Sequence, residues 1–177
     1  AHAAERLGGT VAVITHLAKE DDRVVKKFIA SGIDCYPTYT PCSTMMRLEY
    51  PTTNPDLRDL FVTDTAGSIT ANEVENLNAK AAVIGSSLRG EVGKDVICAL
   101  KARGILVAAD MQGFVRVLRD RKLKYEPWPE MAATLAHVDV VKSDAVEAEF
   151  LTGERDIFKA AKFFAAMGPR EIVLTHK

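Results

Sequence analysis

The sequence has few of the residues that stabilise disulfide-rich or metal-rich proteins. It contains only three cysteines, and none of them has CxxC spacing: Cys35, Cys42 and Cys98. Its four histidines are scattered along the chain and form no pair with metal-ligand spacing. We therefore expect neither a disulfide framework nor a zinc site.

Long apolar runs and a strong charge of either sign are also missing. No run approaches the roughly 20 apolar residues that cross a bilayer, and the opening AHAAERLGG lacks the charged start and apolar centre of a signal peptide. With 23 basic and 24 acidic residues the net charge is −1, which gives no electrostatic attraction to nucleic acid. We expect a cytoplasmic protein with no membrane partner and no nucleic-acid partner.

Three glycine-containing motifs of familiar enzymes are absent as well. The chain has no GxGxxG, no GxxxxGK[ST] and no GxSxG. Dinucleotide sites, P-loops and hydrolase elbows are therefore not supported. At 177 residues and 47% hydrophobic content, the chain fits one domain or a large piece of a bigger one.

Short apolar, β-branched segments alternate with amphipathic segments along most of the chain. Strands are predicted at 10–15, 81–84, 105–109, 138–141 and 171–175, and helices at 2–7, 20–30, 92–102, 144–151 and 157–167. This alternation predicts an α/β fold, with a mostly parallel sheet covered by helices on both faces.

Residues 41–69 break this rhythm. Two extended-looking segments, 43–50 and 57–64, are joined by the turn-rich stretch 51–56, which contains two prolines and an asparagine. The pattern predicts an antiparallel β-hairpin inserted into the α/β body. Such a hairpin needs something to cover its apolar face, so a lid or a dimer contact is the expected role.

Polar residues follow several of the predicted strands. In open parallel sheets ligands bind beyond the carboxyl ends of the strands. The polar stretches at these ends are Thr15-His16, Gly85-Ser86-Ser87, Asp110-Met111-Gln112-Gly113, Lys142-Ser143-Asp144 and Thr175-His176-Lys177. Gly85-Ser86-Ser87 is also compatible with a simple tight turn, an interpretation that suits the two serines better than the glycine.

The stretch from Asp110 to Arg116 has two interpretations. Asp110 is a common residue type for a helix N-cap, and a lone arginine is most often a solvated surface charge. Together, however, Asp110, the Gln112 amide, Gly113 and Arg116 form a polar cluster at the edge of a sheet where ligands bind. Such a cluster is suited to orienting hydroxyl groups and anions.

Asp144 and Glu147 also have two interpretations. An aspartate followed three residues later by a glutamate resembles a capping box, which contributes about 1 kcal/mol. The alternative is a hydrated Mg²⁺ site, since Mg²⁺ prefers one or two carboxylates together with waters and phosphate oxygens. The spacing alone favours the cap.

Taken in order, these segments resemble the ribokinase/PfkB family of carbohydrate kinases. The family's helix ending in "LG", its next strand and its later "GID" resemble Leu7-Gly8, the strand to Ile14 and Gly32-Ile33-Asp34. Its D-x-N/Q-x-x-x-R motif resembles Asp110 to Arg116, in a form most like the inositol-kinase-type branch. The most specific match is KSDAVEAEFLTG, from Lys142 to Gly153, which resembles the family's K-P-N-x-x-E-A-E-x-L-T-G.

The resemblance implies a ribokinase-like fold, a lid at 41–69 and ATP-dependent phosphoryl transfer to a hydroxyl of a sugar or polyol. It implies a substrate site at Gly85, Asp110, Gln112 and Arg116, and a nucleotide site at Asp144, Glu147 and Thr175. It places Mg²⁺ at Glu147, above the capping interpretation, and suggests a monovalent cation and a homodimer formed through the lid hairpin.

The resemblance covers the central part of a family member. A strand with a substrate-binding aspartate is expected before Ala1, and the catalytic G-A-G-D, whose aspartate is the general base, is expected beyond Lys177. These 177 residues alone are therefore expected to be inactive. Asp144 and Ser143 stand where the family has Asn and Pro, and Ala18-Lys19-Glu20 replaces its G-x-D, which affects nucleotide and substrate details.

Two other functions are compatible with the pattern. One is a non-catalytic α/β module that binds a sugar or nucleotide or serves in association. A reading frame that continues into G-A-G-D favours the enzyme, and a stop codon after Lys177 favours the module. A flavodoxin-like regulatory domain is the third alternative, and the inserted hairpin argues against it.

Overall fold

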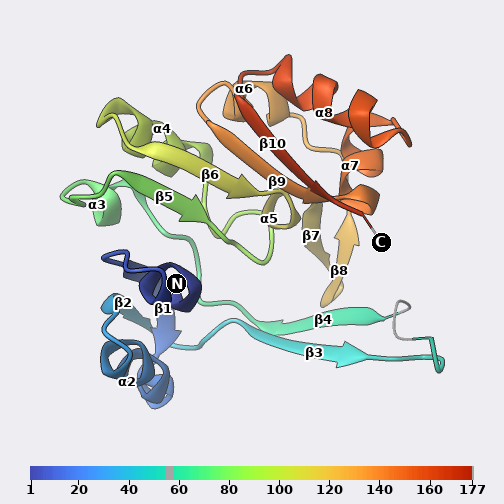
Figure 1. Ribbon diagram of the computed structural model, residues 1–177. Coiled ribbons are helices and arrows are strands. Elements are labelled where there is room, and N and C mark those ends of the chain that lie inside the picture. The colour runs from blue at the N-terminus through green and yellow to red at the C-terminus, as the bar shows by residue number, and fades with distance from the viewer. Residues whose placement is uncertain (55–57, 177) are drawn as a thin grey trace. The chain divides into compact units, whose positions relative to one another are not determined.

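The computed structural model describes residues 1–54 and 58–176. The chain divides into two compact units, Ala1–Ile69 and Thr70–Lys177, whose elements are labelled in Figure 1. No helix among the described residues is both long enough and apolar enough to span a membrane.

The first unit begins with a short α/β segment. Its elements are, in order, helix α1 (His2–Arg6), strand β1 (Ala12–Ala18), a 3-10 turn η1 (Lys19–Asp21), helix α2 (Arg23–Ala30) and strand β2 (Asp34–Thr40). Strand β2 pairs parallel with β1. The sequence predicted that Thr15 and His16 follow this strand. Strand β1 continues to Ala18, however, so both residues lie within it. Strand β2 was not predicted, and Pro37 within its seven residues argues against a strand.

The predicted hairpin is present in the first unit. Strands β3 (Met45–Glu49) and β4 (Asp59–Asp64) pair antiparallel, with Met46 opposite Val62 and a bulge beside Met45. Residues 55–57 of the predicted turn and second segment lie outside the described residues. The hairpin is tied to the end of β1 by Ser43, whose Oγ accepts a bond from the Ala18 amide at 2.9 Å and donates to Asp21 at 2.6 Å.

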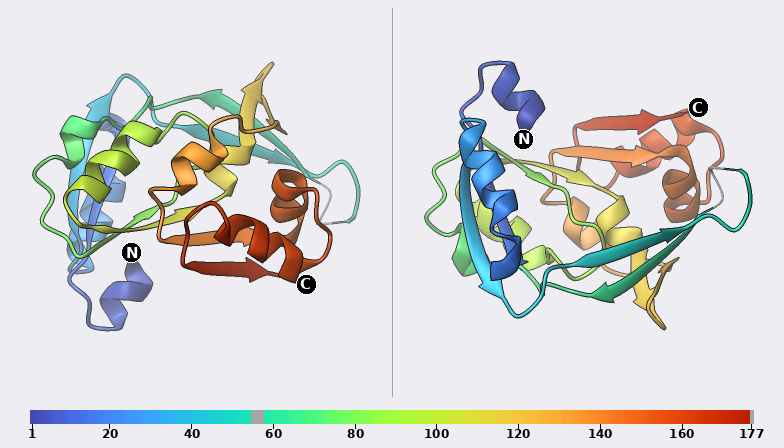
Figure 2. Two further views of the ribbon diagram at one scale, coloured as in Figure 1. Left: turned by 90° about the horizontal axis from the view of Figure 1, so that it is seen from above. Right: turned by 90° about the horizontal axis from the view of Figure 1, so that it is seen from below.

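The second unit is built on a four-stranded parallel sheet. Its strands are β5 (Ala81–Ile84), β6 (Leu106–Asp110), β9 (Val140–Asp144) and β10 (Glu171–Thr175), in the order β10-β9-β6-β5. The α/β prediction is confirmed, and the predicted strands at 81–84 and 171–175 have the predicted bounds. Because all four strands are parallel, their carboxyl ends meet at one edge of the sheet, as Figure 2 shows for β9 and β10.

Helices cover this sheet and close the core. Helix α4 (Lys94–Ala102) packs on β6, α7 (Ala145–Thr152) on β9 and α8 (Ile157–Ala165) on β10, and three short helices complete the unit: α3 (Ala71–Val74), α5 (Gln112–Val115) and α6 (Met131–Leu135). Figure 2 shows α8 lying alongside β10. The fully buried core includes Ile97, Val107, Met111, Val115, Leu135, Val141 and Phe164.

A second hairpin lies between β6 and α6. Strands β7 (Arg116–Arg119) and β8 (Lys122–Tyr125) pair antiparallel, with Arg116 opposite Tyr125. The turn between them places Asp120 and Arg121 at φ values of 50° and 63°, in the left-handed region that non-glycine residues seldom adopt. The sequence did not predict this hairpin.

Asp139, just before β9, connects three elements of the second unit. Its carboxylate accepts bonds from the Val107 amide of β6 at 2.9 Å and from the Lys101 ammonium of α4 at 2.5 Å. Its backbone carbonyl accepts from the Arg170 amide at 2.9 Å. Burial raises the pKa of this carboxyl, but the bonds from Lys101 and Val107 outweigh that effect and hold the pKa below its ordinary value.

We expect Asp139→Asn to lower the free energy of unfolding at neutral pH by about 1.5–3 kcal/mol, because two charge-assisted bonds are lost. A depressed pKa stabilises the fold above the unfolded value of about 3.9, and that stabilisation is lost as the pH falls through the folded pKa. The difference between wild type and variant should therefore shrink in acid. Urea unfolding at a series of pH values measures it.

The matched control for this prediction is Glu171→Gln. Glu171 is exposed at the start of β10, so its substitution should change stability by less than about 0.5 kcal/mol. A wild-type to Asp139→Asn difference that stays constant from neutral to acidic pH would contradict the electrostatic account.

Candidate active site

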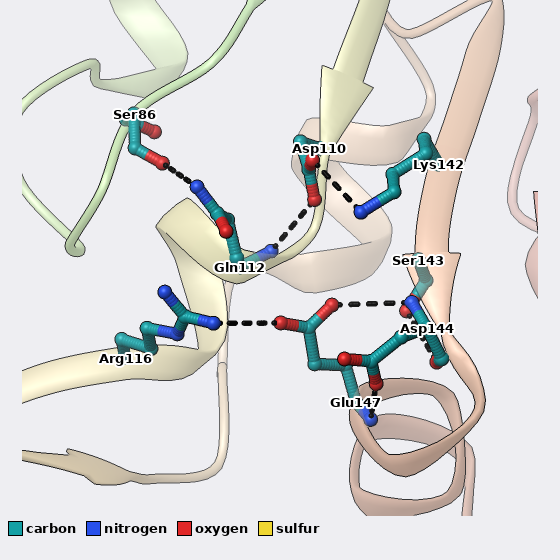
Figure 3. A network of polar contacts seen from close by, with 8 residues as sticks. All are labelled: Ser86, Asp110, Gln112, Arg116, Lys142, Ser143, Asp144 and Glu147. Atoms are coloured by element: carbon teal, nitrogen blue, oxygen red, sulfur yellow. Dashed lines mark hydrogen bonds and ion pairs between the residues drawn. The ribbon is translucent and has the colours of Figure 1, made fainter. Parts of the chain in front are cut away.

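Polar side chains gather at the carboxyl edge of the second unit's sheet. Asp110 ends β6, Asp144 ends β9, and Ser86 follows β5 by two residues. Register places Asp110 beside Lys142 and Thr175 beside Asp144 on neighbouring strands. Figure 3 shows the polar contacts of Ser86, Asp110, Lys142 and Asp144 with Gln112, Arg116 and Glu147.

Asp110 is not the N-cap of α5, since that position is Met111 and no side chain caps this helix. Its Oδ1 accepts a bond from the Gln112 amide at 3.3 Å, and its Oδ2 lies 3.1 Å from Lys142 Nζ. The Asp110 side chain is 23% exposed and that of Lys142 is 43% exposed. Since both remain accessible to solvent, the pair can exchange partners with a bound hydroxyl or anion.

Gln112 joins this group to the loop after β5. Its Nε2 donates to the Ser86 carbonyl at 3.2 Å. The neighbouring Gly113 approaches Ser86 so closely that a Cβ at position 113 would lie 1.9 Å from Ser86 Oγ. Ser86 Oγ is buried and has no hydrogen-bond partner among the described residues, whereas Gly85 is exposed and faces open space.

Arg116 and Glu147 form an ion pair at the inner side of the network. An NH2 group of Arg116 donates to Glu147 Oε1 at 3.4 Å, and the two side chains are 15% and 2% exposed. Arg116 Nε is buried and lacks a partner among the described residues. The guanidinium therefore keeps an unused donor beside its ion pair, which is a suitable arrangement for an incoming anion.

Glu147 is also part of the capping box of α7. Its backbone amide donates to Asp144 Oδ1 at 2.7 Å, and its Oε2 accepts from the Asp144 amide at 3.2 Å. The capping interpretation is thus confirmed. Burial raises the pKa of Glu147, and the bond from the Asp144 amide and the charge of Arg116 oppose that rise.

Tyr125 lies beside this ion pair on strand β8. Burial raises the pKa of the Tyr125 phenol, the negative charge of Glu147 adds to the rise, and Arg116 opposes it. The phenol therefore stays neutral at physiological pH and can serve as a hydrogen-bond donor near Arg116.

Most of the predicted site residues come together in this network. The contacts above form two neighbouring groups: Asp110 with Gln112 and Lys142, and Glu147 with Arg116 and Asp144. Thr175 is exposed and is the register partner of Asp144, while Gly85 precedes Ser86 without a contact of its own. Lys142 and Ser86 were noted only as strand-end residues, because their partners depend on strand register.

The described residues contain no preformed cluster of metal-binding side chains. Over residues 1–54 and 58–176, no three His, Cys, Asp or Glu side chains come together as a metal-binding group. Both carboxylate oxygens of Glu147 already accept bonds. A hydrated Mg²⁺, which keeps several of its waters, fits this edge better than a dehydrated ion held by the protein alone.

Comparison with known proteins identifies the family. A model of the pfkB family of carbohydrate kinases matches residues 1–176. The chain belongs to this family. A search of curated proteins returned no match.

Solved structures agree with this family and with the ribokinase-like fold. A pyrophosphate-dependent kinase in the ribokinase family, in complex with sulfate, matches with a TM-score of 0.93 and 30% identity over 99% of this chain and 62% of its own. A pyrophosphate-dependent kinase of that family, in complex with a pyrophosphate analog and myo-inositol, matches with a TM-score of 0.92 and 28% identity. The match covers 100% of this chain and 62% of that structure's chain. The pfkB-family chain thus spans about 62% of the length of these structures.

A more distant match extends the fold comparison. A ribokinase from Arabidopsis thaliana, in complex with ribose and ATP, has a TM-score of 0.68 and 14% identity, over 98% of this chain and 57% of its own. At that identity the likeness shows the fold alone.

Proposed function

We propose that this chain is part of a kinase that transfers a phosphoryl group to a hydroxyl of a sugar or polyol, with an inositol-type polyol as the first candidate acceptor. The observation that carries the proposal is the likeness to a kinase bound to myo-inositol, which covers 100% of this chain at 28% identity. The polar edge of the second unit's sheet is where such an acceptor would bind.

The proposed acceptor site consists of Gly85, Asp110, Gln112 and Arg116. A polyol offers hydroxyl groups that both donate and accept, and the Asp110 carboxylate and the Gln112 amide supply complementary partners. The open space at Gly85 allows a ring to approach the backbone. Arg116 has an unused buried donor, so it is assigned to the oxygens of the transferred phosphoryl group.

The proposed donor site consists of Asp144, Glu147 and Thr175, with Mg²⁺ as the cofactor and a monovalent cation as a further candidate. Bound Mg²⁺ neutralises charge on phosphate oxygens. Asp144 and Thr175, adjacent on β9 and β10, would meet its water shell. Glu147 is assigned to this group through its contacts with Asp144 and Arg116.

Two phosphoryl donors are considered. ATP is the donor expected from the family resemblance. Inorganic pyrophosphate is the second candidate, because the matches at 30% and 28% identity are both described as pyrophosphate-dependent kinases. In either case the acceptor hydroxyl attacks the terminal phosphorus, its proton leaves to a base, and the bond to the bridging oxygen breaks to release ADP or orthophosphate.

The β3–β4 hairpin is proposed to act as the lid and as a dimer contact. Met45, Leu48 and Tyr50 expose between 44% and 54% of their surface. Apolar side chains on a hairpin favour a cover or a partner.

Replacing Arg116 with methionine should weaken the binding of inorganic pyrophosphate and of Mg·ATP at least about tenfold, because one charged bidentate contact is lost. Titration calorimetry measures the affinities. The matched control is Arg103→Met, since Arg103 is exposed and makes a single bond to the Leu77 carbonyl. Equal affinities in wild type and Arg116→Met would contradict the proposed site.

Product formation separates the acceptors and donors. Phosphorus NMR of mixtures with myo-inositol or ribose, and with either donor, identifies any phosphomonoester formed. Formation with pyrophosphate but not with ATP would assign pyrophosphate as the donor. Because the 177 residues alone are expected to be inactive, the mixtures contain the full-length protein, and ligand binding without turnover in all four would then favour the non-catalytic module.

A further inference from the structure

The position of Arg116 depends on the base of the β7–β8 hairpin. Its side chain makes a long contact of 3.4 Å with Glu147, and its Nε lacks a partner among the described residues. Such a contact fixes a guanidinium only loosely. The backbone at Arg116, where α5 ends and β7 begins, therefore contributes to where the guanidinium lies.

Arg89, in the loop after β5, binds both sides of this hairpin base. Its backbone amide donates to the Arg116 carbonyl at 2.7 Å. Its guanidinium donates to the Phe114 carbonyl at 2.5 Å on the incoming side, and to the carbonyls of Glu126 at 2.7 Å and Pro127 at 3.0 Å on the outgoing side. One residue thus fixes the entry and the exit of the hairpin.

The three groups that accept bonds from the Arg89 side chain are backbone carbonyls, which carry no net charge. Burial lowers the pKa of Arg89, and the charge of Glu126 opposes this effect. The guanidinium remains protonated, because its ordinary pKa is above about 12. Its planar fork reaches carbonyls on both sides of the hairpin base at once, which a lysine ammonium cannot reproduce.

The loop that carries Arg89 is itself anchored. The Glu91 carboxylate accepts bonds from the Ser87 amide at 2.6 Å and from the Leu88 amide at 3.4 Å. The Leu88 side chain is buried in the core of the second unit. The loop after β5 is therefore held in place, and Arg89 in turn holds the base of the hairpin against this loop.

We propose that Arg89 is a positioning residue for Arg116: it holds the backbone of the β7–β8 hairpin so that the Arg116 guanidinium faces the phosphate-binding edge of the sheet. The anion-binding part of this inference rests on the function proposed above. The positional part rests on the contacts of Arg89 alone.

The first test is a double-mutant cycle on pyrophosphate binding. Arg89→Lys should lower the affinity for inorganic pyrophosphate about 10- to 100-fold, since small displacements of a binding group have effects of that size. In the Arg116→Met background the same substitution should change the affinity less than about twofold, because the group it positions is gone. Equal losses in both backgrounds would show that Arg89 does not act through Arg116.

The second test does not depend on ligand binding. The Nε–H resonance of Arg116 in a ¹H–¹⁵N spectrum, assigned by its loss in Arg116→Lys, should shift and broaden in Arg89→Lys but not in the control Arg103→Lys. An unchanged Arg116 resonance in Arg89→Lys would overturn the positional role, even if pyrophosphate binding proved independent of Arg116.

A third variant covers the case in which Arg89→Lys does not fold. Arg89→Gln keeps part of the hydrogen bonding to the carbonyls, and circular dichroism verifies its folded state. It should give a smaller shift of the Arg116 resonance than Arg89→Lys. Loss of binding in Arg89→Gln with an unshifted Arg116 resonance would count against the proposal.

Discussion

Replacing Glu147 with alanine should lower the free energy of unfolding by about 3–5 kcal/mol, because removing one partner of a buried ion pair leaves an uncompensated charge. The Glu147 side chain is 2% exposed and Arg116 is 15% exposed, so water cannot readily replace the lost carboxylate. The same change removes the Glu147 side chain's bond from the Asp144 amide at 3.2 Å. Urea or thermal unfolding measures the loss.

Two matched variants separate the contributions. Arg116→Met should be less destabilising than Glu147→Ala, because the remaining carboxyl can take up a proton, whereas a remaining guanidinium cannot lose one. The double variant Glu147→Leu/Arg116→Met should recover part of the loss, since an apolar pair fills the space without a buried charge. A double variant less stable than both single variants would indicate that capping and packing, rather than the charge, dominate.

The sequence predicted strands β5 and β6 of the second unit well because the predicted segments are continuously apolar. Residues 81–84 and 105–109 lack charged side chains, and a buried parallel strand requires such runs. The helix at 157–167 was predicted from its amphipathic pattern and ends at Ala165 in the structure. Burial follows the pattern only in part, since Val83 of β5 and Phe158 of α8 are exposed although both are apolar.

The contacts of the site could not be predicted in the same way. The pair Lys142–Asp110 depends on which residue of β9 lies beside the end of β6, and a shift of register by one residue would separate them. Arg116 and Glu147 are 31 positions apart and come from a hairpin and a helix whose packing the sequence does not reveal. The polar residue types at the strand ends indicated that the site lies at the carboxyl edge of the sheet. Which of these side chains bind one another, however, depends on the fold.

The β7–β8 hairpin was missed because its turn lacks the usual signal. Two-residue hairpin turns commonly use Asn-Gly or Asp-Gly, which tolerate positive φ. Here Asp120 and Arg121 adopt φ values of 50° and 63°, and the flanking strands have only four residues each. Arg89 was missed for a related reason, since its side chain donates to backbone carbonyls, which leave no trace in residue type.

Gly113→Ala should lower the free energy of unfolding by about 2–3 kcal/mol, although alanine is the better helix former by about 1 kcal/mol. The new Cβ would lie 1.9 Å from Ser86 Oγ, 2.7 Å from the Ser86 carbonyl oxygen and 2.8 Å from Ser86 Cβ. A rotation of the Ser86 hydroxyl can remove only the first of these clashes. The α5 segment must therefore move away from the loop after β5, which stretches the bond from Gln112 to the Ser86 carbonyl.

Two controls distinguish this clash from a general effect of losing a glycine. Gly85→Ala adds a Cβ that meets nothing within 4 Å, so stability should change by less than about 0.5 kcal/mol. In the Gly113→Ala background, Ser86→Gly removes two of the three close atoms and should restore part of the lost stability in a double-mutant cycle. If Ser86→Gly restores none of it, the loss must arise within α5 itself, and the close approach of the two segments would not be what requires glycine at position 113.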